Sequence, residues 1–447
     1  MKRNSFFRAC TVASVALPSI VNSDNRFQRS SMKKPQKLKA VCANGTLAGN
    51  TLEELRDNYL YYLNEYKEFQ HKYVVDREYG GYCINTDWDG PPLSYEKSTS
   101  SEGRGTWTFS FLYNNIDPDP RHIEAARRSV EFILKHKPEE DVFFSATYTR
   151  EGKPCKQGTD ISGDMYLADG LAEFSKVPEN EKYWDIAKDI MLKCVRIIDK
   201  PGYSASELTP KGSRFLGNWF DLIRVATQML ESRDDSEIKA IADRCIDAQM
   251  KCHYNPDYGL YNERINFDFT RPNNELAQHG SLGYATAMLW MTMYEAIRRN
   301  DKALFDENAK RFRRNIEVAW DDVYGGVFTD LRHIDENRWE LGKAGWGQME
   351  NLIGLLCIIE HTGAEWSKQW FDKLYTWTMT HFPLKPYGLP LWQDYTNRKA
   401  LFVKGDRGRR AENLHYPRYL MLNLLAVERI MKRDGNISDV FARYFRK

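Results

Sequence analysis

Six apolar helical segments recur along the chain, and this repeat constrains the fold more than any other feature. Leu, Met, Trp, Tyr and Ala recur in them at three- and four-residue spacing, as in helices that bury most of their surface. The spacing of the polar markers at their starts, roughly 54 to 69 residues, indicates a stacked repeat with all markers at one end. The segments run over about 107–115, 165–175, 219–231, 283–297, 349–360 and 416–432, and the markers are Arg104, Asp164, Asn218, His279, Trp346 with Glu350, and His415.

A second set of helices with charged faces alternates with the first. Three of them end alike, in an Asp or Asn, a Tyr three residues later and a Gly that turns the chain. The alternation predicts an all-α fold of six helical hairpins closed into an (α/α)6 barrel, a toroid with inner and outer rings. An open solenoid would use the same pairs, but closure lets the markers converge. The expected outer helices cover 52–73, 121–136, 181–199, 236–254 and 306–320, with the shared endings at 76–81, 255–259 and 321–326.

Composition fits one large domain. The chain has 447 residues, 42% of them hydrophobic, and no linker rich in Gly, Ser or Pro interrupts residues 52–435. Residues 24–51 are polar and expected to be disordered, and 436–447 form a C-terminal tail. The net charge of +2 gives no reason to expect nucleic acid or a membrane surface as a partner. The eight cysteines show no Cys-x-x-Cys spacing, so no zinc or redox motif is indicated.

Residues 1–23 resemble a signal peptide. Basic residues precede an apolar run over 9–21, and Val21 and Ser23 suit cleavage after Ser23. A genuine leader would place the protein outside the cytoplasm, in the periplasm of a bacterium, and otherwise the protein is cytoplasmic. An organellar transit peptide and a wrongly assigned start remain alternatives. No later run is long enough to span a bilayer.

Of nine histidines, only His279 and His415 immediately precede apolar segments of the inner type. Imidazole suits proton transfer because its pKa lies near neutral pH. The alternative for each is a structural histidine. A metal site would need companions at close spacing, such as His-Glu-x-x-His, and the sequence has none.

Four further side chains suit a sugar site. Arg104 stands between two glycines, and its guanidinium suits an oxygen anion, although pairing with Glu102 is the alternative. Trp346 and Glu350 are four residues apart, on one face of a helix, where Trp offers a ring to a sugar and Glu a hydroxyl partner. Trp392 could also stack on a sugar, with core packing as the alternative.

Five motifs, in order over about residues 55–430, resemble those of the N-acylglucosamine 2-epimerase family, which includes cellobiose 2-epimerases and mannose isomerases. The most specific of them are Trp346-x-Gln348-x-Glu350 and His415-Tyr416-Pro417-Arg418, and the short Lys404-Gly405 pair lies between these two. The motifs are Gly103-Arg104 with Trp107 and the upstream Lys97; Asp164-Met165-Tyr166 running into Gly170-Leu171-Ala172-Glu173; Trp346-x-Gln348-x-Glu350; and Lys404-Gly405 followed by His415-Tyr416-Pro417-Arg418.

The resemblance implies an (α/α)6 barrel that epimerises or isomerises free sugars with two histidines and an arginine, and with neither a metal nor a redox cofactor. His415, His279 and Arg104 are then the expected catalytic residues. The implied partner is a small sugar, and a homodimer is an assembly that the sequence allows. Together, the markers and the resemblance predict the substrate-binding residues Trp346, Glu350, Lys97, Asp164, Asn218, Trp392 and Arg418.

The chain departs from the family pattern around the first histidine. Gln278 precedes His279, and Leu282 replaces the Glu that the family has three residues after this histidine. We therefore expect the His279 imidazole to lack an orienting carboxylate, and His415 to be the firmer of the pair. Ser100 and Glu102 also replace a Trp and a Gln of the family pattern.

The expected reaction inverts C2 of an open-chain sugar. One histidine removes the C2 proton, the other protonates the opposite face, and Arg104 stabilises the enediolate between these steps. A glycoside hydrolase or polysaccharide lyase on the same toroid is the alternative, with Asp160, Asp164 and Glu350 as candidate carboxylates. An inactive sugar- or protein-binding relative is a third possibility.

Overall fold

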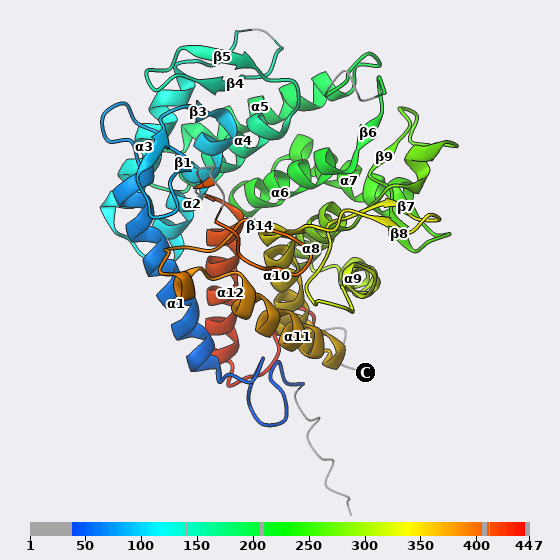
Figure 1. Cartoon of the computed structure of the whole chain (residues 1–447). Coiled ribbons are helices and arrows are strands. Elements are labelled where there is room, and N and C mark those ends of the chain that lie inside the picture. The colour runs from blue at the N-terminus through cyan, green and yellow to red at the C-terminus, as the bar shows by residue number, and fades with distance from the viewer. Residues whose placement is uncertain (1–37, 140, 206–209, 405–408, 411, 443–447) are drawn as a thin grey trace, which may run out of the picture. The chain divides into compact units, whose positions relative to one another are not determined.

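The computed structural model describes residues 38–139, 141–205, 210–404, 409–410 and 412–442. Helices dominate this part of the chain, and they alternate between inner and outer positions (Figure 1). The inner helices are α2 (Thr99–Asn115), α4 (Ser162–Phe174), α6 (Leu216–Ser232), α8 (Leu282–Arg299), α10 (Gly345–Thr362) and α12 (His415–Lys432). The outer helices are α1 (Leu52–Phe69), α3 (Pro120–Leu134), α5 (Lys182–Ile198), α7 (Ser236–Asp247), α9 (Lys302–Ala319) and α11 (Glu365–His381).

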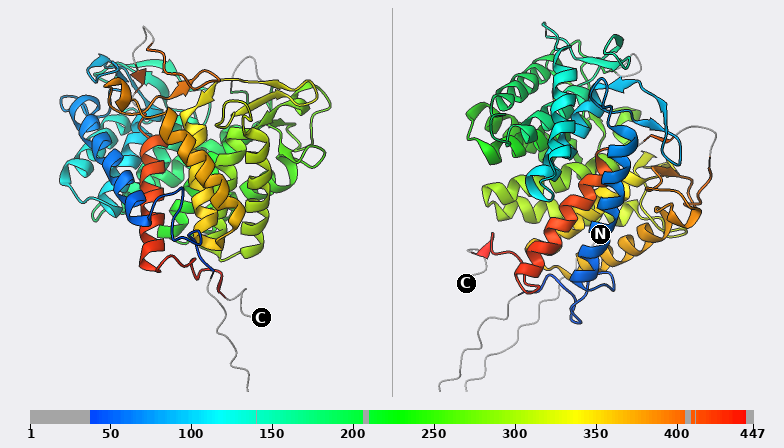
Figure 2. Two further views of the ribbon diagram at one scale, coloured as in Figure 1. Left: turned by 60° about the horizontal axis from the view of Figure 1, so that its bottom comes forward. Right: turned by 90° about the vertical axis from the view of Figure 1, so that its left-hand side faces the viewer.

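The inner helices form a closed ring. Each contacts the next inner helix along the chain, and α12 returns to contact α2. Helices α3, α5, α7, α9 and α11 each pack on the inner helix that precedes them, while α1 packs on α12, beside which it lies in both views (Figures 1 and 2). Consecutive inner helices have the same direction, so their first residues gather at one end of the ring, which we call the mouth. The expected (α/α)6 barrel is confirmed.

Short antiparallel strands join neighbouring hairpins at the mouth. A strand just before each of four inner helices pairs with a strand from the following connection, and β15 pairs with β1 to link the last repeat to the first. The strands are β1 (Asn85–Thr86), β2 (Pro92–Ser94), β3 (Lys97–Ser98), β4 (Ser145–Tyr148), β5 (Pro154–Gln157), β6 (Arg214–Phe215), β7 (Tyr254–Asn255), β8 (Leu260–Tyr261), β9 (Arg264–Ile265), β10 (Gly280–Ser281), β11 (Asp330–His333), β12 (Arg338–Trp339), β13 (Lys343–Ala344), β14 (Tyr395–Thr396) and β15 (Arg409–Arg410). These pairings hold the loops of the mouth in register.

Several inner helices begin earlier than the sequence pattern predicted. Helix α2 begins at Thr99 and not near residue 107, so Arg104 lies inside it. The reason is tertiary packing: a Cβ on Gly103 would lie 2.3 Å from the backbone of Leu167, so this glycine lets α2 and α4 approach closely. Such contact outweighs the low helix propensity of glycine. Asp164, Asn218, Trp346 and Glu350 likewise lie within the first two turns of their helices.

Two of the repeated helix endings contain the same buried ion-pair cluster. Lys97 Nζ lies 3.1 Å from Asp76 Oδ2, and Arg150 Nε lies 2.9 Å from the same oxygen. In the fifth repeat, Lys343 and Arg398 each approach Asp321 to 3.0 Å. Each lysine also donates to the carbonyl of a turn glycine, Gly80 or Gly325. The cluster therefore fixes the turn that leads to the strand before an inner helix.

The folded domain extends beyond both ends of the expected range, residues 52–435. Ala40 and Leu47 are fully buried, and the Ala40 amide donates to the carbonyl of Gly435 (2.9 Å). The expected disorder over 24–51 is therefore wrong for residues 38–51, because this segment covers the end of α12. In the expected tail, Phe441 is buried and Ser438 bonds to His361 (2.6 Å). The expected leader, 1–23, lies outside the described residues.

Within the described part of the chain, no helix is both long enough and apolar enough to cross a membrane.

Candidate active site

His415 is the first residue of α12, and its imidazole is held by a carboxylate from α10. His415 Nδ1 lies 2.8 Å from Glu350 Oε1. Arg418, one turn later on α12, donates to the same oxygen, and Trp290 Nε1 of α8 donates to Glu350 Oε2 (2.6 Å). Glu350 and Arg418 are fully buried, whereas the His415 side chain is 15% exposed. Three inner helices thus orient one imidazole toward the mouth.

The electrostatics of this group favour a neutral imidazole. Burial lowers the pKa of His415 more than Glu350 and Glu412 raise it. Burial alone would raise the pKa of Glu350, but the charge of Arg418 and the hydrogen bond from His415 outweigh it and lower this pKa to about 2. Ionised Glu350 therefore accepts the Nδ1 proton of His415. The Nε2 lone pair of the imidazole is then the group left to accept a proton.

His279 has two carboxylate neighbours. It follows a short 3-10 helix, η3 (Glu275–Gln278), and stands three residues before α8. Its Nδ1 lies 2.6 Å from Glu263 Oε2, and its Nε2 lies 3.2 Å from Asp330 Oδ1. Burial acts to lower the pKa of His279, but hydrogen bonds to Asp330 and Glu263 outweigh it and raise this pKa to about 9. His279 is therefore an imidazolium at neutral pH.

The expectation that His279 lacks an orienting carboxylate is wrong. Leu282 is indeed buried in α8 and supplies none. Instead, the strand pairing of Ser281 with Asp330 brings Asp330 beside the ring, and the Glu263 amide donates to the His279 carbonyl (3.2 Å). The carboxylates come from neighbouring loops and not from the helix that follows the histidine.

A line of aromatic rings extends from His415 toward the start of α8, the helix that follows His279. The Trp346 ring lies 5.8 Å from the His415 ring and 5.9 Å, nearly stacked, from the ring of Tyr284. Tyr284 is in the first turn of α8, and its pKa is raised chiefly by burial and also by the nearby charges of Glu263 and Asp330. His279 and His415 are thus at the same end of the ring, on either side of a partly exposed aromatic surface.

Arg104 faces another part of the mouth. Its guanidinium lies over the ring of Tyr166, 4.1 Å from the centroid, and its Nε has no hydrogen-bond partner among the described residues. Burial raises the pKa of the nearby Asp221 to about 7, against the lowering effects of Arg224 and Arg104. Arg104 is therefore a cation with hydrogen-bonding capacity to spare, as an enediolate oxygen would require.

The structure does not bring every predicted residue into this group. Lys97 belongs to the buried ion-pair cluster with Asp76. Asp164 pairs with Lys193 of outer helix α5 (2.7 Å) and accepts from the Phe144 amide (3.0 Å), so it faces away from the mouth. Trp392 is 1% exposed and packs against Tyr62 and Tyr416 in the core. Asn218 is in the first turn of α6 and is buried.

Sequence reasoning missed Glu263 and Asp330, although the sequence carried a signal for both. Each lies four residues after the last glycine of a repeated helix ending, Gly259 or Gly326. Asn85 has the same offset from Gly81 in the first repeat. An acidic residue at one phase of the repeat was therefore visible beforehand. Sequence reasoning also missed four residues inside the apolar helices, because side chains there are normally assigned to the core: Tyr166, Asp221, Tyr284 and Trp290.

Known proteins resemble this chain in fold and, over one segment, in sequence. The family model described as N-acylglucosamine 2-epimerase matches residues 232–407. Among solved structures, cellobiose 2-epimerase from Spirochaeta thermophila has a TM-score of 0.71 at 14% identity, covering 85% of this chain and 98% of its own. A D-mannose isomerase has a TM-score of 0.69 at 12% identity, with 84% and 98% covered. A search of curated proteins finds no match.

A family 76 glycoside hydrolase (mannosidase) from Bacteroides thetaiotaomicron shares the fold more distantly, with a TM-score of 0.58 at 11% identity and 85% and 100% covered. At such identities these structures show the fold alone. The family-model match adds sequence evidence and confirms the resemblance to the N-acylglucosamine 2-epimerase family, a family of sugar epimerases and isomerases. The matched segment contains His279, Trp346 and Glu350 but not Arg104 or His415.

Proposed function

We propose that the protein is a sugar 2-epimerase or aldose–ketose isomerase that acts on a free reducing sugar by proton transfer between His415 and His279. The observation that carries this proposal is that two histidines at one mouth have unlike carboxylate contacts: His415 Nδ1 lies on Glu350, which Arg418 shares, and His279 lies between Glu263 and Asp330. Burial lowers the pKa of His415, whereas the hydrogen bonds to Asp330 and Glu263 outweigh burial and raise the pKa of His279 to about 9, so His415 suits the base and His279 the acid. A reaction that removes a proton from one face and returns one to the other needs such a pair.

The steps follow from these groups. The open-chain aldehyde makes the C2 proton acidic, and His415 Nε2 accepts that proton while the electron pair moves into the C1 oxygen. Arg104 stabilises the resulting enediolate oxygen. His279 then donates its Nε2 proton to the other face of C2, which gives the epimer. Protonation at C1, with transfer of the O2 proton to O1, gives a ketose instead. The reaction changes no oxidation state overall.

Remaining contacts suit a sugar ring and its hydroxyl groups. Trp346 and Tyr284 present a partly exposed aromatic surface between the two histidines, on which the C–H face of a sugar can pack. Asp221, a buried carboxylate whose charge interacts with that of Arg104, is a candidate hydroxyl partner on the Arg104 side of the mouth. Asn218 at the start of α6 is a further candidate for a hydroxyl contact.

Two of the three carboxylates that the sequence offered for glycoside hydrolysis are already paired with other side chains. A hydrolase needs one carboxylic acid whose pKa is raised and a second carboxylate facing it. Glu350 has a lowered pKa and accepts from His415, Arg418 and Trp290, and Asp164 is paired with Lys193. Of the three carboxylates that the sequence offered, only Asp160 is exposed, in the loop before α4.

Proton NMR of candidate sugars in deuterated water with the purified protein tests the proposal. N-acetylglucosamine, N-acetylmannosamine, glucose, mannose and cellobiose should be tried first. Loss of the C2 proton signal with growth of the epimer or ketose is expected. Cleavage of a glycoside without C2 exchange would instead establish a hydrolase, and no exchange with any sugar while the protein is folded would favour an inactive binding relative.

A further inference from the structure

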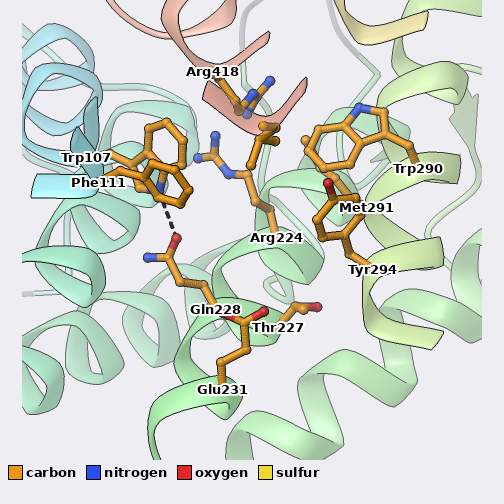
Figure 3. A pocket seen from close by; sticks show the side chains of 11 residues that line it. Trp107, Phe111, Arg224, Thr227, Gln228, Glu231, Trp290, Met291, Tyr294 and Arg418 are labelled. Carbon is orange, nitrogen blue, oxygen red and sulfur yellow. Dashed lines mark hydrogen bonds between the residues drawn. The ribbon is translucent and has the colours of Figure 1, made fainter. Parts of the chain in front are cut away.

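A cavity lies inside the ring, beyond the mouth residues, toward the ends of the inner helices. Its volume is about 100 Å³. We call it the C-terminal cavity, and its lining includes Trp107, Phe111, Arg224, Trp290, Tyr294 and Arg418 (Figure 3). Phe111 follows Arg104 by seven residues on α2, which places it about 10 Å further along the helix. The cavity therefore lies further along the inner helices than Arg104, and it shares Trp290 and Arg418 with the group that holds Glu350.

Aromatic rings form two opposite walls of the C-terminal cavity. Trp107 and Phe111 stack at 4.8 Å on one side, and Trp290 and Tyr294 form an edge-to-face pair at 5.3 Å on the other (Figure 3). Trp107 is fixed by a hydrogen bond to Gln228 (2.8 Å). An engineered apolar cavity of comparable size, about 150 Å³, accommodates a benzene ring. The walls thus suit a flat ring of six atoms.

Two buried arginines lie at the inner end of this cavity. Arg418 is 2% exposed, and its Nε and Nη1 have no hydrogen-bond partner among the described residues. Arg224 is 9% exposed and pairs with Asp169 at 3.0 Å, yet none of its guanidinium nitrogens makes a hydrogen bond within the described part of the chain. Buried donors of this kind usually have a partner. A planar carboxylate matches a guanidinium in shape and charge.

We propose that the C-terminal cavity binds a small aromatic carboxylate, with its ring between the Trp107 and Trp290 walls and its carboxylate on Arg418 and Arg224. Glu231 at the outer end is 50% exposed and lies 3.8 Å from Lys176, so its charge is partly met and solvated. An aromatic carboxylate bound there would also affect the catalytic group, because Arg418 donates to Glu350 and Glu350 holds His415. This last consequence rests on the proposed function, whereas the binding does not.

Isothermal titration with three probes tests the site. Benzoate has both a ring and an anion, benzyl alcohol has the ring alone, and acetate has the anion alone. We expect saturable binding of one benzoate per chain, with the other two at least about tenfold weaker. Equal binding of all three, or no saturable binding of benzoate, would overturn the proposal.

Two variants locate the binding. Leu422 lines the cavity and lies two turns into α12, so Leu422→Trp should fill the space and abolish benzoate binding. Gln228→Glu keeps the acceptor for Trp107 and adds a negative charge to the wall, so it should weaken benzoate by about tenfold even where the tryptophan variant does not fold. Unchanged binding in Gln228→Glu would place benzoate elsewhere and overturn the proposal.

Kinetics supply an independent readout. In a protein that epimerises sugars, benzoate at the C-terminal cavity should lower kcat and leave the KM for sugar unchanged, since it acts through Arg418 and not at the mouth. A raised KM with unchanged kcat would place benzoate at the sugar site and contradict the proposal. Because titration needs no turnover, loss of the proposed epimerase function would leave the binding result intact.

Discussion

His279 and His415 lie at the same end of one ring, but they meet different charges. Two carboxylates, Glu263 and Asp330, contact the two nitrogens of His279. Among the described residues, the carboxylate that contacts the His415 imidazole is Glu350, which is shared with Arg418, while Glu412 accepts from the His415 amide. The first arrangement raises the pKa of the imidazole to about 9, and in the second burial lowers it.

The difference teaches how a repeated fold can make two unlike groups from one residue type. Both histidines stand at the start of an inner helix, His415 as the first residue of α12 and His279 three residues before α8. What differs is the source of the acidic partner. Glu350 is buried within α10 and already neutralised by Arg418, whereas Glu263 and Asp330 come from the strand-bearing loops and form no ion pair with an arginine within the described part of the chain. Charge in the surrounding repeats, and not the histidine itself, assigns acid and base.

Replacing His415 by alanine should have the largest effect on turnover. We expect epimerisation to fall by about 100- to 10,000-fold, because in the proposed reaction this imidazole accepts the C2 proton. His279→Ala should also stop epimerisation, yet it should leave some C2 deuterium exchange from the face that His415 serves. Exchange and epimer formation are measured together by NMR. His381→Ala, at the end of α11, is a matched control. Near-full activity in a folded His415→Ala variant would contradict the two-histidine reaction.

Glu350→Gln should have the second-largest effect on turnover. The amide still fits beside His415 but no longer stabilises its imidazolium after proton abstraction, so kcat should fall by about a hundredfold with little change in KM. Arg418 also loses its partner charge, which should lower the free energy of unfolding. Glu336→Gln, an exposed carboxylate of the β11–β12 turn, serves as the control. A kcat within twofold of wild type would show that Glu350 does not act through His415.

The sequence predicted the alternation of helices because apolar periodicity survives in every repeat, and it singled out His415, Glu350 and Arg418 as candidates because each stands at or near the start of an apolar helical segment. It missed the early start of α2, because Gly103 has a low helix propensity and the helix there is stabilised by close packing against α4. It also predicted that Lys97 and Asp164 bind the sugar, since a sequence pattern does not show toward which neighbours a charged side chain points. The acids beside His279 depend on strand pairing between distant loops, such as Ser281 with Asp330.

Asp330→Asn should make the two histidines more alike. Activity requires neutral His415 and protonated His279, so it should fall as pH drops through the lowered pKa of His415 and as pH rises through about 9, where His279 loses its proton. Removing one carboxylate should move the alkaline limb of the kcat/KM profile down by roughly one to two pH units. The acid limb should not move. If the alkaline limb of the Asp330→Asn profile stayed at the wild-type pH, that limb would not report the titration of His279.

Lys97→Met should have the smallest effect on turnover, and it sharpens the comparison from outside the mouth. Lys97 matches a lysine of the family motif, yet it is buried against Asp76 and the carbonyl of Gly80. Methionine retains the length of the side chain but leaves Asp76 with Arg150 alone. We therefore expect unfolding to become easier by about 2–4 kcal/mol, measured by denaturant titration, with kcat/KM within about twofold.

Lys343→Met is the matched control for this prediction, because Lys343 has the same position against Asp321 in the fifth repeat. Both variants should lose stability alike, since each leaves one aspartate with one arginine. If Lys97→Met lowered kcat/KM more than tenfold while Lys343→Met did not, at equal stability, Lys97 would contact the sugar. The ion-pair cluster of the first repeat would then differ from its counterpart in function, as His279 and His415 do at the mouth.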